Sequence, residues 1–187
     1  PFVMHAAVPS HGLTAVFDPS KGGLAFAKLG IYDHMNKGGP LSSFVLGPVF
    51  ERHPRLKIVI AETGGTDWVR HAMSVYDAIQ AGDEHTLTPS IKPAEPIWDS
   101  QLPALRALPR KPSEYLGTNV WVQLHCHHRD WATVEESGPD KLVWGSDFPH
   151  AESTWPNSMT YLGEIQAKFG LSRDTMEPVS YTHLTLP

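Results

Sequence analysis

Lys141-Leu-Val-Trp-Gly-Ser-Asp147 is an apolar run that ends on a carboxylate. Two further runs share this pattern: Pro1-Phe-Val-Met-His5 ends on an imidazole, and Leu56-Lys-Ile-Val-Ile-Ala-Glu62 ends on a second carboxylate. Short runs rich in β-branched and aromatic residues are typical of buried parallel strands. The carboxyl ends of parallel strands meet at one edge of an open sheet or at one mouth of a barrel. We therefore expect His5, Glu62 and Asp147 to gather around one point, as in an enzyme.

The segments between these runs alternate helices with long loops. A fourth strand is expected at 119–125, and helices are expected at 41–53 with a bend at Pro48, at 67–81, at 130–136 and at 157–169. The strand–helix alternation has no hairpin signal, so it predicts a parallel α/β sheet with right-handed crossovers. Two excursions rich in glycine and proline, 11–40 and 83–117, are interpreted as loops that either close over a ligand or pack against a second subunit.

Composition narrows the class of protein. The chain has 187 residues and a formal net charge of −5. Without a block of Lys and Arg it gives no support for a nucleic-acid or anionic-membrane partner. The single cysteine, Cys126, excludes an internal disulfide and favours a reducing, cytoplasmic location. No run reaches the length of a membrane span. Eleven histidines favour metal or proton-transfer chemistry.

Two longer blocks carry a family resemblance. They are Val49-Phe-Glu-Arg-His-Pro-Arg-Leu-Lys-Ile-Val-Ile-Ala-Glu-Thr-Gly-Gly-Thr-Asp-Trp68 and Lys141-Leu-Val-Trp-Gly-Ser-Asp-Phe-Pro-His-Ala-Glu-Ser-Thr-Trp-Pro-Asn157. They resemble the decarboxylase-like branch (amidohydrolase family 2) of the amidohydrolase superfamily. These metal-dependent (β/α)8 barrels include aminocarboxymuconate-semialdehyde decarboxylase and the dihydroxybenzoate decarboxylases. The GSD-x-PH block is the specific part of the resemblance.

The resemblance implies a partial (β/α)8 TIM barrel, strands 5 to 8 with their helices and two long βα loops. A whole barrel typically needs about 250 residues, and the His-x-His pair of the family's first strand is missing. Residues 1–177 are therefore expected to be the C-terminal part of a metal-dependent hydrolase barrel, inactive as a fragment alone. Residues 178–187 resemble translated sequencing-adapter sequence and are expected to be a non-native tail.

The resemblance also implies roles for individual residues. His5 corresponds to the metal ligand of strand 5, and Asp147 to the strand-8 Asp that binds metal and takes part in catalysis. Glu62 stands where a proton-carrying His is common, so it either relays a proton or becomes a ligand. His150 and His125 are candidates for binding substrate; the alternatives are a solvated loop histidine and a strand end followed by polar loop residues. The expected cofactor is a divalent ion, Zn2+ first and Mn2+ second.

These observations predict a metal-dependent hydrolase or a non-oxidative decarboxylase of a small, aromatic or unsaturated carboxylic acid. Both reactions need the same groups at the strand ends, so the sequence does not choose between them. It also leaves the oligomeric state open, a homo-oligomer included. The rival prediction is a non-catalytic half-barrel or remnant without a complete metal site, whose exposed sheet edges need a partner.

Overall fold

The computed structural model describes residues 2–5, 41, 43–62, 66–82, 103, 106–124, 128–151 and 153–182. The excursion 11–40 lies outside these residues, as does most of 83–117. The α-helices are α3 (Val49–Arg52), α4 (Asp67–Ala81), α6 (His128–Ala132), α7 (Val134–Ser137), α8 (Ser158–Phe169) and α9 (Arg173–Glu177). Shorter turns of 3-10 helix are η4 (Pro112–Tyr115) and η5 (Pro139–Lys141), and η6 (Pro178–Thr182) is a π-helix.

Four strands form one parallel sheet. They are β1 (Phe2–His5), β2 (Ile58–Ala61), β3 (Val120–Leu124) and β4 (Leu142–Trp144). They lie side by side in chain order, β1-β2-β3-β4, and each neighbouring pair is parallel. A sheet that adds every strand beside the preceding one, without reversing its order, has the winding of a β/α barrel, whereas a doubly wound sheet reverses. The expected parallel α/β arrangement is confirmed, with all four strands ending at one edge.

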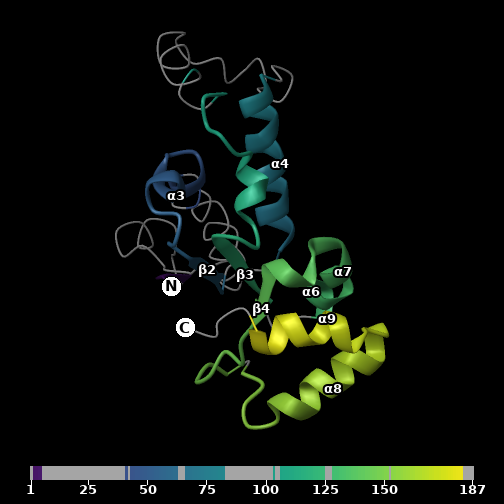
Figure 1. The fold of residues 1–187 in the computed structure, drawn as a ribbon. Helices are drawn as coiled ribbons and strands as arrows, with labels where there is room; N and C mark the ends of the chain where they lie inside the picture. The colour runs from purple at the N-terminus through teal and green to yellow at the C-terminus, as the bar shows by residue number, and fades with distance from the viewer. Residues whose placement is uncertain are drawn as a thin grey trace, which may run out of the picture.

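The two faces of the sheet have different surroundings. Alternate strand residues belong to the main core together with the helices: Ile58, Ile60, Val120, Val122, Leu124 and Leu142. Val59, Trp121 and Val143 form a separate buried cluster. Successive side chains of a strand point to opposite faces, so this second cluster lies on the face opposite the main core. In Figure 1 helix α4 lies above the strands, α6 and α7 lie to their right, and α8 lies below and to the right.

Helix α4 begins and ends where the sequence predicts, but its first residues differ in detail. Gly82 ends it in the left-handed conformation, with φ of 82°, and its N–H bonds to the carbonyls of Ala78 and Ile79. Thr66 occupies the cap position, yet its side chain makes no capping hydrogen bond. Its hydroxyl lies instead 3.3 Å from the Ser137 hydroxyl in the buried contact with α7. The Thr66 oxygen therefore makes a tertiary contact in place of the capping hydrogen bond that threonine often makes at this position.

The bend expected at Pro48 is present. Residues 43–45 are helical, 46–48 form a turn, and α3 begins at Val49. Proline lacks an N–H and its ring clashes with the preceding helical turn, so the helix is interrupted here. Leu41, Val45 and Phe50 are all fully buried on either side of the break. The break thus lets both pieces keep their apolar side chains in the main core.

An ion-paired cluster holds the segment before β3 against α3. The guanidinium of Arg110 and the hydroxyl of Tyr115 both donate to Glu51 Oε1, each at 2.9 Å. Arg110 also lies over the Tyr115 ring, 4.2 Å from its centroid. Burial, followed by the hydrogen bond to Glu51, raises the pKa of Tyr115 to about 12. This cluster of Glu51, Arg110 and Tyr115, called the Glu51 cluster below, lies before β3 begins.

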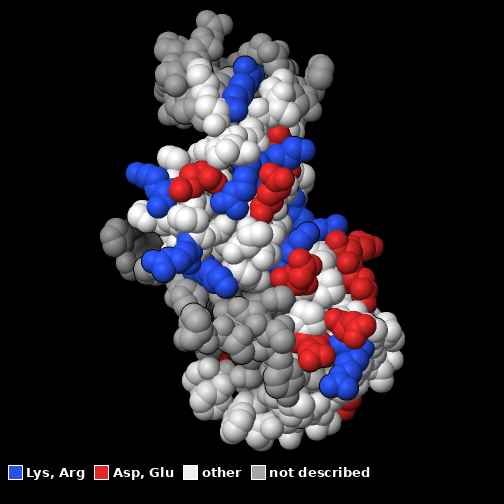
Figure 2. Space-filling model, viewed as in Figure 1, with Lys and Arg blue, Asp and Glu red and all other residues white. Residues whose placement is uncertain are grey.

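Figure 2 shows acidic and basic side chains intermixed on the visible face. In the helices that the structure describes, none is both long enough and apolar enough to cross a membrane. Val179 in η6 is 2% exposed and belongs to the main core. The proposed boundary at Glu177 between barrel and non-native tail stays a prediction.

Candidate active site

Two carboxylates stand at the carboxyl edge of the sheet in a strained backbone conformation. Glu62 follows the last residue of β2 directly, and Asp147 follows β4 by three residues. Their φ angles are 51° and 61°, the only positive values among the non-glycine residues described. L-residues rarely adopt this left-handed region, and such strain concentrates at functional sites. The chain therefore makes a sharp turn at each carboxylate, shortly after β2 and β4 end.

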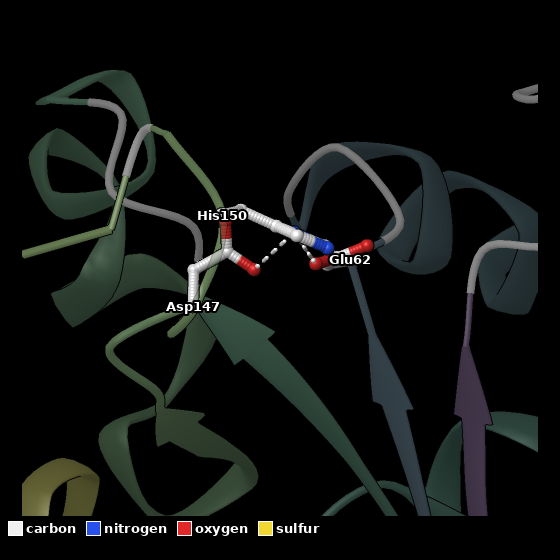
Figure 3. Close-up of side chains that lie close together, drawn as sticks. All are labelled: Glu62, Asp147 and His150. Carbon is white, nitrogen blue, oxygen red and sulfur yellow. Dashed lines mark hydrogen bonds and ion pairs between the residues drawn. The ribbon is translucent and has the colours of Figure 1, made fainter.

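His150 joins these carboxylates from the loop after β4. Its Nδ1 lies 2.7 Å from Glu62 Oε1 and 3.2 Å from Asp147 Oδ1. Figure 3 shows the imidazole between the two acidic side chains, which come from different strands. A ring nitrogen carries at most one proton, so Nδ1 donates one hydrogen that the two carboxylates share. The imidazole and the acids therefore form one interacting group.

The loop that carries His150 is closed by hydrogen bonds of its own. The carbonyl of Ser146 accepts from the Thr154 N–H at 3.0 Å and from the Ser153 hydroxyl at 2.8 Å. The His150 N–H donates to the Asp147 carbonyl at 2.9 Å. These bonds wind residues 146–154 back on themselves. They hold His150 above the end of β4, where its ring reaches Glu62.

The three side chains differ in exposure. The Asp147 side chain is 7% exposed, that of Glu62 16%, and that of His150 49%. Asp147 Oδ2 is buried and has no hydrogen-bond partner in the described part of the chain. A buried carboxylate oxygen without a partner is costly and needs an explanation, such as an ion. The two carboxylates are thus largely buried, whereas the imidazole of His150 is half exposed to solvent.

The geometry fits a divalent cation. One ligand atom from each of Glu62, Asp147 and His150 lies within 4.8 Å of the other two. The Nδ1 contacts of 2.7 and 3.2 Å are hydrogen-bond distances, so Nδ1 has to release its proton before it binds an ion. Imidazole and carboxylate are donors that Zn2+ and Mn2+ accept. The unpartnered Asp147 Oδ2 provides a further oxygen for an ion.

The structure brings together three of the five predicted site residues, namely Glu62, Asp147 and His150. His5 ends β1 opposite Ala61, one residue before Glu62, so its backbone stands at the same edge. Its side chain lies outside what the structure describes, and His125, which follows the end of β3, lies outside the described residues. Sequence reasoning did not foresee the contact between His150 and Glu62, since 88 positions separate them.

A family model described as amidohydrolase matches residues 1–181 of the chain. The chain belongs to the amidohydrolase family. Amidohydrolases have a TIM-barrel-like α/β fold, are hydrolase-like enzymes and generally use divalent metal ions. The winding of β1 to β4 agrees with this fold, and the cluster of Glu62, Asp147 and His150 offers an amidohydrolase a place for an ion.

Among solved structures, nine chains match. One is an amidohydrolase from Mycobacterium avium subsp. paratuberculosis K-10, with 22% sequence identity and a TM-score of 0.60. The match covers 96% of this chain and 40% of that one. At this identity the likeness concerns the fold alone, and the chain spans less than half the length of that protein. No curated protein matches the chain.

Proposed function

We propose that this amidohydrolase chain belongs to a metal-dependent hydrolase or non-oxidative decarboxylase that acts on a small, aromatic or unsaturated carboxylic acid. The observation that carries the proposal is the convergence of Glu62, Asp147 and His150 at the ends of separate strands. The buried Asp147 Oδ2, which has no hydrogen-bond partner within the part of the chain that the structure describes, supports an ion there. The motif resemblance to the decarboxylase-like branch supports the substrate class.

The same proposal assigns β1 to β4 to strands 5 to 8 of a (β/α)8 barrel, with residues 1–177 as its C-terminal part. The 40% span of the mycobacterial structure supports this assignment. The activity then belongs to the whole barrel, and this chain alone is inactive. His5 at the end of β1 would face the same mouth as Asp147, because parallel strands end at one edge.

Asp147 and His5 are the residues we assign to the ion, Zn2+ first and Mn2+ second. When bound, the ion would polarise a substrate oxygen or lower the pKa of a bound water. The acidic cluster would supply the charge that retains a divalent cation. His125, from the end of the neighbouring strand, would line the substrate pocket with His150.

Glu62 and His150 are the residues we assign to proton movement. When Nδ1–H of His150 donates to Glu62 Oε1 at 2.7 Å, the other ring nitrogen, Nε2, is left as a proton acceptor. The His150 side chain is half exposed, so a small substrate would reach the imidazole. Glu62 orients the ring and stabilises its charged form, as a carboxylate does in other imidazole-based proton carriers.

The test compares variants of the whole barrel, of which residues 1–177 are the C-terminal part, and each substitution keeps the backbone. Asp147→Asn suits the left-handed conformation, which Asn tolerates, and Glu62→Gln preserves shape. Calorimetry measures Zn2+ and Mn2+ binding; CO2 release from hydroxybenzoates and hydrolysis of small esters or lactones measure turnover. We expect Asp147→Asn to lose ion and turnover, and Glu62→Gln to lose turnover alone.

Glu136→Gln is the matched control, because Glu136 is an exposed carboxylate on α7 that forms a 3.8 Å ion pair with Arg70. It should keep both properties. An Asp147→Asn variant that retains the ion and full turnover would refute the proposal.

A further inference from the structure

Gln123 is a polar side chain on the face of the sheet opposite the main core. It lies on β3 opposite Val143, two residues after Trp121. Side chains two residues apart on a strand share a face, so Gln123 faces the side of Val59, Trp121 and Val143. Those neighbours are buried and apolar. Gln123 is therefore a half-buried polar side chain in an otherwise apolar layer, near the carboxyl edge of the sheet.

Gly145 makes the room that this carboxamide occupies. A Cβ added at Gly145 would stand 2.7 Å from Gln123 Nε2 and 3.3 Å from its Cδ. Those separations are below ordinary van der Waals contact, so the end of Gln123 lies directly against the Gly145 backbone. Gly145 comes two residues before Asp147. The missing side chain thus lets the Gln123 carboxamide lie against β4 two residues before Asp147.

The chemistry of a carboxamide suits this position. Gln123 has two N–H donors and no charge, and its strand lies between the strands that lead into Glu62 and Asp147, so it offers donors at this edge without forming an ion pair with either acid. In the described part of the chain no residue hydrogen-bonds its carboxamide. A substrate carboxylate arriving beside two acidic side chains needs an N–H donor that compensates for their repulsion.

We propose that Gln123 is a specificity-determining residue that donates a hydrogen bond from Nε2 to the carboxylate of the substrate, in a space that Gly145 keeps open. This inference rests on the proposed function for its substrate class. Its geometric basis, the Gln123–Gly145 packing, is independent of any ion.

The experiment measures binding of benzoate, an unreactive aromatic carboxylate, to the purified, Zn2+-loaded whole barrel by NMR titration. Gln123→Met keeps the length of the side chain and removes its donors, and we expect the benzoate Kd to rise tenfold or more, as loss of a hydrogen bond to a charged group does. Gly145→Ala leaves Gln123 in place but pushes its Nε2 aside, and we expect a rise of similar size.

The double variant Gln123→Met, Gly145→Ala tests whether the two changes remove the same hydrogen bond or weaken binding independently. If both changes act on one hydrogen bond, their effects are not additive. The benzoate Kd of the double variant should then be about the same as that of the single variant that binds benzoate less tightly. Gly163→Ala, an added methyl on α8 with nothing within 4 Å, is the control and should bind as wild type. Thermal melts verify that each variant is folded.

Two results overturn the proposal: wild-type protein that does not bind benzoate, or Gln123→Met that binds it as tightly as wild type. Failure of the proposed function looks different. If Gln123→Met weakens benzoate binding while the wild type turns over none of the test substrates, Gln123 keeps its assignment and the proposed reaction falls. If Asp147→Asn abolishes turnover while Gln123→Met binds normally, only the Gln123 assignment falls.

Discussion

Replacing Tyr115 by Phe tests the Glu51 cluster, which holds the segment before β3. The change removes one hydroxyl that donates to Glu51 Oε1 at 2.9 Å and leaves the buried ring in place. A hydrogen bond to a charged group contributes about 1.5 to 3 kcal/mol. For a domain of this size that corresponds to a fall in Tm of roughly 3 to 12 °C. Thermal unfolding at pH 7 measures it.

The pH dependence gives a sharper readout. Because the pKa of Tyr115 is raised from 10 to about 12, the folded protein keeps this phenol protonated where the unfolded chain has lost the proton. The stabilisation is fully present below pH 10 and is lost as the pH rises through 12. A pKa difference of this size corresponds to roughly 3 kcal/mol, about half of it lost by pH 11. The Tyr115→Phe variant has no phenol at this position, so its free energy of unfolding should not show this loss.

The assay is urea unfolding of wild type and Tyr115→Phe at pH 8 and pH 11, so that titration of all other groups cancels in the difference. The difference in free energy of unfolding between wild type and Tyr115→Phe should be smaller at pH 11 than at pH 8. Ultraviolet titration adds a second measure, because Tyr115 is one of five tyrosines and the variant should lose the last fifth of the phenolate signal. Equal gaps at both pH values would refute the reasoning.

Three further predictions concern charge, glycine and metal. The hydrogen bond from Tyr115, followed by Arg110, lowers the pKa of Glu51. The stability that the ionised Glu51 contributes is therefore lost as the pH falls below 4.5. Glu51→Gln should make the free energy of unfolding, measured by circular dichroism, less dependent on pH in the acid range. Gly163→Ala, in exposed helix, should raise stability by up to about 1 kcal/mol, whereas Gly170→Ala, with φ of 64°, should lower it by about 1 kcal/mol; melts shifting the same way would contradict this. Zn2+ at 100 times its Kd should stabilise wild type by about 2.7 kcal/mol but leave Asp147→Asn unchanged in a thermal-shift assay.

The local pattern of the chain predicted most of the elements. The four strands lie inside the predicted runs and are shorter at the ends, because edge residues of a run lack a pairing partner in the sheet. Helix α4 has the predicted bounds, since its apolar spacing and Gly82 are local signals. The single helix expected at 130–136 is instead two short pieces, α6 and α7, with Thr133 between them.

The candidate site was predicted in part. Glu62 and Asp147 could be placed at one edge because every parallel strand ends there, a rule that needs only the strand pattern. Gln123 was missed, although a polar residue inside an apolar strand and a glycine on the next strand were both visible. Their contact depends on which strands are neighbours and in what register, and register is a property of the sheet.

The amino-acid sequence by itself determined that apolar strands alternate with helices, that they lie parallel, and that His5, Glu62 and Asp147 terminate three of them. These features follow from short-range preferences and from the need to bury apolar side chains. Only the tertiary structure decided that His150 lies between the two carboxylates and that Asp147 Oδ2 has no hydrogen-bond partner among the described residues. Those contacts join residues far apart in the chain, through two left-handed turns whose cost is borne by packing elsewhere in the fold.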